Sequence, residues 1–213
     1  MIDYIWRINN FDVFYTNETN GGGDFFYIEY ADVIKNWYNK ETFDSTLEWC
    51  SGPGFIGFGL YAERLTRNIS LLDKYKPAVD IMYKTKSTND DIKIYHGDNL
   101  GVIPETETFD LVVGNPPHWK NKEDATKSLP HSQFDNHLTD ILIDEDWKAH
   151  ADFFKKIKTR LSQDGKILLQ ENNTGSNPRD FQKVMDESGL RISNIGNSRM
   201  YPNIYYMEIV HAE

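Results

Sequence analysis

The residues that follow the apolar stretch Phe109–Gly114 have the types and spacing that most directly suggest chemistry. The stretch is typical of a buried strand, and Asn115, Pro116 and Pro117 end it abruptly. Proline has a fixed φ and no amide hydrogen, so the backbone here is stiff and its carbonyl groups are not used by a continuing helix. The side-chain carbonyl of Asn115 and the main-chain carbonyl of Pro116 can therefore accept both hydrogens of a planar NH2 group. An ordinary Asn-Pro turn explains the same residues equally well.

Two flat side chains, His118 and Trp119, come next and can stack on the group that carries the nitrogen. The order Asn-Pro-Pro-aromatic after a hydrophobic strand resembles the motif of class I S-adenosylmethionine-dependent methyltransferases that modify the amino nitrogens of adenine or of protein glutamine. The fourth position of that motif is most often Tyr, Phe or Trp, and here it is His118. The resemblance implies that Asn115, Pro116 and His118 are catalytic and that Pro117 and Trp119 contact the substrate.

A glycine-rich segment upstream fits a strand-to-helix turn that passes close to a ligand. Gly52, Gly54 and Gly57 alone would suit a nicotinamide dinucleotide equally well. In S-adenosylmethionine enzymes the ligand is a cationic sulfonium, and an acidic residue is expected before the turn; Glu48 occupies that place. The family pattern has a glycine where this chain has Cys50, which is small enough for the turn to form. The resemblance therefore implies S-adenosyl-L-methionine as the cofactor of this segment.

Further acidic residues follow the next two expected strands. Asp73 stands where an acid takes ribose hydroxyls, in dinucleotide and S-adenosylmethionine sites alike. Asp98 resembles the acid that accepts from the adenine amino group, and Asn99 lies beside it. Each acid alone fits a surface turn. We call Asn115, Pro116 and Pro117 the proline corner. Together with the glycines and the proline corner, the two acids predict one cofactor site at consecutive strand ends.

The elements that must position these residues alternate along the chain from Thr46 onward, as in a doubly wound α/β fold. The resemblance implies a Rossmann-like methyltransferase fold with a mostly parallel seven-stranded sheet. Strands are expected at residues 46–50, 68–73, 92–96, 109–114, 166–170, 190–195 and 204–211, the last two as an antiparallel pair at the sheet edge. Helices are expected at residues 55–66, 77–86, 144–161 and 177–188, with Asp144 capping the third and Gly165 ending that unit.

Two regions lie outside this alternation. Residues 1–44 are predicted to be an N-terminal extension, with a short helix at 32–38, before a methyltransferase domain of residues 45–213. The aromatic residues at positions 25, 26, 27 and 30 either cover the cofactor and contact substrate, as we predict for Tyr27, or pack on the sheet as core. The polar stretch 120–143 reads as a long loop, which is a natural place for substrate selection.

The composition of the chain argues against several kinds of binding partner. The 213 residues carry a formal net charge of −10, which argues against broad attraction to nucleic acid. No apolar run approaches the roughly 20 residues of a membrane span, and the first residues lack the features of a signal peptide, so we expect a cytoplasmic protein without a membrane partner. Cys50 is the single cysteine, and no metal site is expected. His131, His137 and His150 are expected at the surface or in loops.

We therefore predict an S-adenosylmethionine-dependent N-methyltransferase that acts on a planar amide or amino nitrogen. A protein glutamine or a small molecule is the favoured acceptor, and an adenine amino group in RNA or single-stranded DNA is the alternative. Two hypotheses from other classes stay open. One is an NAD-dependent oxidoreductase, against which Glu48 and the proline corner argue. The other is a non-catalytic paralogue that binds only the cofactor, which the unusual His118 motivates.

Overall fold

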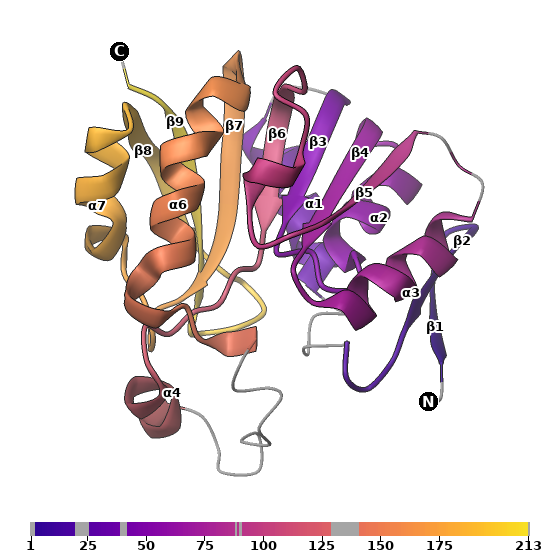
Figure 1. Ribbon diagram of the computed structural model, residues 1–213, viewed down its shortest axis with the longest axis horizontal. Helices are drawn as coiled ribbons and strands as arrows, with labels where there is room; N and C mark the ends of the chain where they lie inside the picture. Colours follow the sequence, from indigo (N-terminus) through magenta and orange to yellow (C-terminus); the bar gives the residue numbers. More distant parts are fainter. Residues whose placement is uncertain are drawn as a thin grey trace.

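The computed structural model describes residues 3–19, 26–38, 42–87, 89, 91–128 and 141–212. These residues form a seven-stranded sheet with the order β5-β4-β3-β6-β7-β9-β8 and a separate two-stranded sheet, β1-β2 (Figure 1). The strands of the larger sheet are β3 (Phe43–Trp49), β4 (Thr66–Asp73), β5 (Ile92–His96), β6 (Phe109–Gly114), β7 (Leu161–Asn172), β8 (Leu190–Asn197) and β9 (Ile204–His211). Strands β3 to β7 pair in parallel, whereas β9 runs antiparallel to β7 and β8. The predicted fold class is confirmed.

Helices cover both faces of this sheet because its central strands are apolar on both sides. Leu111 and Val113 of β6 pack with α1 (Phe26–Trp37) and α2 (Phe55–Ala62), and Val112 between them packs with α6 (Lys148–Ile157) and α7 (Pro178–Glu187). The helix α3 (Lys76–Lys86) packs with β4, β5 and the hairpin. Figure 1 shows α6 and α7 side by side in front of the C-terminal strands.

The N-terminal residues form more structure than the sequence predicts. Strands β1 (Tyr4–Ile8) and β2 (Phe11–Tyr15) make an antiparallel hairpin, and α1 starts six residues before the expected helix. The hairpin packs through aromatic rings: Phe11 stacks on Phe58 of α2 with ring centroids 5.5 Å apart. Aromatic pairs of this kind add to the stability that area burial supplies, which fixes the hairpin on α2.

The aromatic residues of α1 lie in different places. Tyr30 is fully buried, and its hydroxyl donates to the main-chain oxygens of Leu168, at 3.1 Å, and of Gly114. Tyr27 packs edge-on against Trp6. Residue 25 and the side chain of residue 26 lie outside the described part of the chain. Tyr30 is therefore a core residue that ties α1 to β6 and β7, and covers no ligand.

The stretch 120–143, expected as a loop, contains the helix α4 (Lys122–Ser128). Asn121 caps this helix, since its side-chain oxygen accepts from the main-chain nitrogen of Asp124 at 2.8 Å. The short polar segment has almost no apolar periodicity, which is why its sequence reads as a loop. Figure 1 shows α4 projecting away from the sheet. Residues 129–140 of the expected loop lie outside the described part of the chain.

The expected helix 144–161 is wrong at both ends. Residues 145–147 form a 3-10 turn, and Asp146 and Trp147 have left-handed φ values of 54° and 57°, so α6 begins at Lys148. At the other end, β7 starts at Leu161 and includes Gly165, which was expected to end the helical unit. Apolar spacing alone does not reveal these two breaks, because Trp147 and Leu161 continue the helical pattern.

Candidate active site

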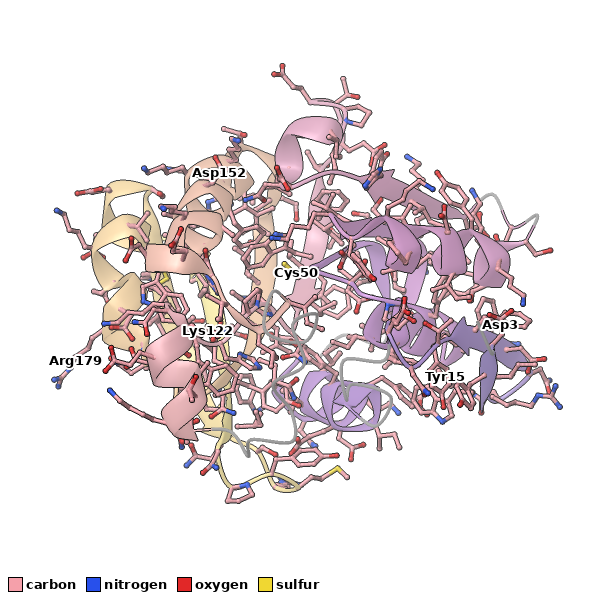
Figure 2. All side chains as sticks on the ribbon, turned by 60° about the horizontal axis from the view of Figure 1, so that its bottom comes forward. Asp3, Tyr15, Cys50, Lys122, Asp152 and Arg179 are labelled. Carbon is pink, nitrogen blue, oxygen red and sulfur yellow. The ribbon has the colours of Figure 1, made fainter. Side chains whose placement is uncertain are left out.

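The predicted site residues meet at a cavity of about 810 Å³, a size typical of small-molecule sites. It lies at the carboxyl ends of β3, β4 and β6, and the strand order reverses between β3 and β6. Ligands of open α/β sheets commonly bind at such a reversal. In Figure 2, Cys50 lies near the centre of the molecule, between Lys122 and Asp152 on one side and Tyr15 and Asp3 on the other. The predicted residues that line the cavity are Glu48, Cys50, Gly52, Asp73, Asp98, Asn99, Asn115, Pro116, Pro117, His118 and Trp119.

Three of the predicted residues do not line it: Gly54, Gly57 and Tyr27. Gly54 has a φ of 85° and precedes the first turn of α2, and Gly57 lies within that turn. A Cβ on Gly57 would lie 2.7 Å from the carboxylate oxygen Oε2 of Glu48. These two glycines therefore shape the turn and let α2 approach the sheet.

Glu48 is buried at the end of β3, and its Oε2 accepts from the main-chain nitrogen of Gly57 at 2.8 Å. The carboxyl thus faces the N-terminus of α2, where the helix dipole favours negative charge. Burial nevertheless dominates and raises the pKa of Glu48 to about 8, with a further contribution from the charge of Asp73. A cation in the cavity would offset this cost and favour the ionised form.

Cys50 occupies the place of the first glycine with a left-handed φ of 55°, a conformation that non-glycine residues adopt at a cost. The cysteine therefore preserves the turn of the family pattern under local strain. Burial, and next the charge of Asp73, raises the pKa of its thiol well above the ordinary value. The thiol stays protonated and is not a nucleophile.

The acids after β4 and β5 differ in how far the protein already occupies their carboxylate oxygens. Asp73 Oδ2 accepts from the main-chain nitrogen of Gly52 at 2.6 Å and Oδ1 from that of Tyr75 at 2.7 Å, so the carboxylate ties the glycine turn to β4. Each of its oxygens retains a second acceptor position. Asp98 is exposed to the cavity. Asn99 is committed to the protein, since its amide nitrogen donates to Ala149 O at 3.0 Å.

The proline corner after β6 presents an acceptor with nothing bound to it. Oδ1 of Asn115 is buried and has no hydrogen-bond partner among the described residues. An unpaired buried acceptor is costly, and a ligand N–H would satisfy it. The corner is fixed from behind by Gly175, where a Cβ would lie 2.3 Å from the main-chain oxygen of His118. Trp119 is only 2% exposed, and its main-chain oxygen accepts from Asp144 N at 2.8 Å.

Behind the corner, five side chains form a buried polar chain that the sequence did not reveal. Nδ1 of His118 lies 3.5 Å from Glu171 Oε2, just beyond an ordinary hydrogen bond. Glu171 Oε1 is 3.1 Å from His150 Nε2, and His150 Nδ1 is 2.7 Å from Asp144 Oδ2. Ser176 donates to Glu171 Oε2 at 2.8 Å. This chain joins the corner to the start of α6.

His150 was expected at the surface or in a loop, and this is wrong: the side chain is fully buried. It lies in the first turn of α6, on the side that meets Glu171 of β7, and the left-handed residues before the helix turn Asp144 back onto it. Asp144 accepts from the main-chain nitrogens of Ala149 and His150, at 2.8 and 2.9 Å, and so satisfies the helix start. The detectable signal was Glu171, a carboxylate two residues after the apolar run of a central strand.

The chain matches the family model described as methyltransferase small domain over residues 32–137, about half of its length. It is 26% identical over 142 residues to a bifunctional methyltransferase of Rickettsia conorii, covering 65% of this chain and 26% of that one. It is also 25% identical over 130 residues to a release factor glutamine methyltransferase of Leptospira interrogans, covering 59% of this chain and 45% of that one. Sequence match and sheet order agree. By fold and sequence similarity, the chain contains a class I S-adenosylmethionine-dependent methyltransferase domain.

Solved structures support the fold. A ribosomal protein L11 methylase of Lactobacillus delbrueckii subsp. bulgaricus has a TM-score of 0.60 at 11% identity, covering 87% of this chain and 77% of that one. An S-adenosylmethionine-dependent methyltransferase of Clostridium acetobutylicum has a TM-score of 0.59 at 13% identity, covering 88% and 92%. The methyltransferase described here spans from about a quarter to under half the length of the two sequence relatives named above.

The cavity of this methyltransferase fits the cofactor that its class uses. Glu48, Asp73 and Asp98 bring carboxyl groups to its lining, which suits a ligand that carries a sulfonium and an ammonium group. Asn115 and Pro116 line the same cavity. Among the described residues, no cluster of side chains could hold a metal ion, and no helix is long and apolar enough to cross a membrane.

Proposed function

We propose that this methyltransferase modifies the nitrogen of a planar amide or amino group. The observation that carries the proposal is the buried, unpaired Oδ1 of Asn115 at the carboxyl end of β6, in the same cavity as the glycine turn. An acceptor that brings an NH2 group satisfies this oxygen, whereas a hydroxyl or thiol brings a single hydrogen for two rigid acceptors, Asn115 Oδ1 and Pro116 O.

S-adenosylmethionine supplies an activated methyl group when it is bound. Asn115 and the main-chain oxygen of Pro116 accept the two N–H groups, so that the nitrogen lone pair points out of the plane of the acceptor and towards the cavity. The rigid corner makes this orientation inexpensive at the moment of reaction. Alignment of reactants in near-attack geometry can supply up to about 7–11 kcal/mol of a barrier.

The acceptor that we favour is a glutamine side chain of a protein. Two features support this choice: the similarity to a release factor glutamine methyltransferase, and the formal net charge of −10, which opposes the many phosphate contacts that nucleic acid needs. The amide of glutamine is planar and presents two N–H groups to the corner. A free adenine amino group in single-stranded nucleic acid has the same geometry, so the test must include it.

The experiment follows transfer of radioactive methyl groups from S-adenosylmethionine to two probes: a short peptide with a central glutamine and a single-stranded oligonucleotide rich in adenine. We expect methylation of the peptide. Methylation of the oligonucleotide alone would replace the proposed acceptor by adenine, and transfer to oxygen or sulfur acceptors alone would contradict the proposal.

The matched variants are Asn115→Ala and Asn194→Ala, the second at an exposed position of β8. We expect Asn115→Ala to reduce turnover by roughly 100-fold or more, as loss of a positioned polar group in an active site does. Cofactor affinity, measured by calorimetry, should stay within about twofold, because this side chain orients the acceptor. Asn194→Ala should change neither. Normal turnover of Asn115→Ala would remove the residue from its assigned role.

A further inference from the structure

The geometry of the buried polar chain behind the proline corner determines the charge of His150. Both ring nitrogens of His150 face carboxylate oxygens, Asp144 Oδ2 at 2.7 Å and Glu171 Oε1 at 3.1 Å. An ionised carboxylate only accepts hydrogen bonds, so each ring nitrogen must carry a hydrogen and His150 is an imidazolium cation. Burial alone would lower the pKa of His150, but the hydrogen bonds that its ring donates to the two carboxylates outweigh burial and raise this pKa to about 9.

Two carboxylates and one imidazolium leave one negative charge in excess. Burial alone would raise the pKa of Glu171, but His118 and His150 beside it hold the pKa below its ordinary value, so the carboxylate stays ionised. Glu171 and His150 are fully buried, and Asp144 is 5% exposed. An unbalanced negative charge in such a place is costly, and the arrangement lacks one positive charge.

His118 is the group placed to supply that charge. Its side chain is 9% exposed and lines the cavity, and Nδ1 is 3.5 Å from Glu171. With Nδ1 directed at Glu171, the other ring nitrogen, Nε2, is the one available to a molecule in the cavity. Tyr, Phe or Trp, the residues most common at this position of the motif, can stack on a target but cannot accept a proton at neutral pH.

We propose that His118 is the proton acceptor of the methyl-transfer reaction, and that Glu171, His150 and Asp144 are positioning residues that hold it and stabilise its cationic form. The inference rests on the proposed function, because it needs an N–H acceptor. As the N–CH3 bond forms, the C–S bond breaks and its electron pair stays on sulfur. One of the two N–H groups then leaves its acceptor at the corner, and the positively charged nitrogen passes that proton to Nε2 of His118. The new imidazolium pairs with Glu171, and it later returns the proton to water.

The charges behind His118 sum to one negative charge, because two carboxylates face the single imidazolium of His150. Glu171 approaches from β7, and behind it stand His150 on α6 and Asp144 before that helix. The hydroxyl of Tyr205 from β9 is 3.4 Å from Ser176 Oγ, and burial, followed by the charge of Glu171, raises its pKa, so it stays neutral. Removal of the Glu171 charge should therefore make His118 harder to protonate.

The first test is His118→Phe, which keeps a flat ring and removes the proton acceptor; His211→Phe, at the far end of β9, is the control. With the glutamine peptide, we expect His118→Phe to lose roughly 100-fold or more in kcat and to lose the acid limb of the pH–rate profile. Calorimetry should show cofactor affinity unchanged, which verifies folding. His211→Phe should match the unmodified chain. Equal rates and equal pH profiles for His118→Phe and the unmodified chain would overturn the proposal and leave the proposed function intact.

The second test does not depend on turnover. Nuclear magnetic resonance of histidine-labelled protein follows the six imidazoles, with His118 assigned by its absence in His118→Phe. We expect Glu171→Gln to change the chemical shift of Nδ1 of His118, because the carboxylate that faces this nitrogen is lost, and to move the acid limb of the rate profile to lower pH. A chemical shift of Nδ1 that does not respond to Glu171→Gln overturns the pairing, even if neither acceptor probe is methylated and the proposed function fails.

Discussion

The site consists of the cavity and the buried polar chain behind it, and its two halves treat buried carboxylates in opposite ways. In the cofactor half, at the ends of β3 and β4, burial raises the pKa of Glu48 and of Asp73. In the acceptor half, at the end of β7 and the start of α6, burial would raise the pKa of Glu171 and Asp144 too, but His150 and its neighbours hold both values low. The two halves differ in whether a cation is built in.

This difference indicates where each half obtains its positive charge. The acids of the cofactor half are held by main-chain N–H groups, which orient a carboxylate without neutralising it. Their negative charge is balanced only when a cationic ligand binds. The acceptor half contains a permanent imidazolium, so its carboxylates are ionised in advance and poised for a second one. The cofactor half is thus tuned by its ligand, and the acceptor half by the protein.

The strongest way to break this comparison is to remove the built-in cation with His150→Leu. Two buried carboxylates would lose their partner, so we expect the free energy of unfolding to fall by about 3–5 kcal/mol at pH 7. Urea denaturation measures it, and His211→Leu, a partly buried histidine outside the buried chain, is the control. A loss below about 1 kcal/mol would show that His150 is not the cation that balances Asp144 and Glu171.

The same variant has a signature in pH. The pKa of His150 is about 9 in the folded chain, against 6.5 for an unperturbed histidine, so its contribution to stability is complete below about pH 6.5 and is lost as pH rises through 9. The unmodified chain should therefore lose stability between about pH 6.5 and 9. This decline should be smaller in His150→Leu. Parallel stability curves for the two proteins would contradict the assignment.

The cofactor half is probed by Asp73→Ala, for which we expect a loss of roughly 1–3 kcal/mol in the free energy of cofactor binding, through an unpaired ribose hydroxyl and a loosened glycine turn. Calorimetry with S-adenosylhomocysteine measures this loss. Asn115→Ala is the comparison variant, because it should leave cofactor affinity nearly intact. An unchanged affinity of Asp73→Ala would remove the residue from the cofactor site.

The two halves also differ in how far the sequence predicts them. The acids of the cofactor half follow glycine spacing and strand ends, because main-chain donors arise in any strand-to-helix turn of that shape, and the structure brings Glu48, Cys50 and Asp73 to one cavity. The proline corner is equally local, since β6 and Asn115 are adjacent in the chain. Both features depend on residues close in sequence, so a single segment carries the signal.

The acceptor half depends on pairings that appear only in the assembled sheet. Glu171 reaches His118 because β7 pairs with β6, and His150 because the left-handed turn at Asp146 and Trp147 shifts the start of α6. Apolar periodicity runs through that turn without interruption, so it gave a helix that begins too early. The sequence did not predict the hairpin β1-β2 for a related reason: its aromatic residues are stabilised by packing on α2, which lies far away in the sequence.

Glu48 allows a smaller test of the cofactor half. Because its pKa is about 8 without a cation nearby, a ligand cation must displace the proton, and we expect the affinity for S-adenosylmethionine to rise about tenfold between pH 7 and 8.5. Glu48→Gln should bind more weakly with a flatter dependence. Titration of the cofactor's own amino group affects both proteins equally, so the difference between the two curves isolates Glu48. Superimposable curves would show that Glu48 keeps its protonation state on binding.

The smallest expected effect concerns the strained position in the glycine turn. Cys50 adopts a φ of 55°, so Cys50→Gly relieves strain on the order of 1 kcal/mol, against which a more flexible unfolded chain costs about the same. We expect a free energy of unfolding within about 1 kcal/mol of the unmodified chain, and unchanged cofactor affinity. Cys50→Val, which is similar in size but branched at Cβ, should lose more than 1 kcal/mol and weaken cofactor binding. If the valine variant matched the glycine variant in both measurements, the turn would tolerate any small side chain, and the left-handed backbone at this position would not be what the cofactor half requires.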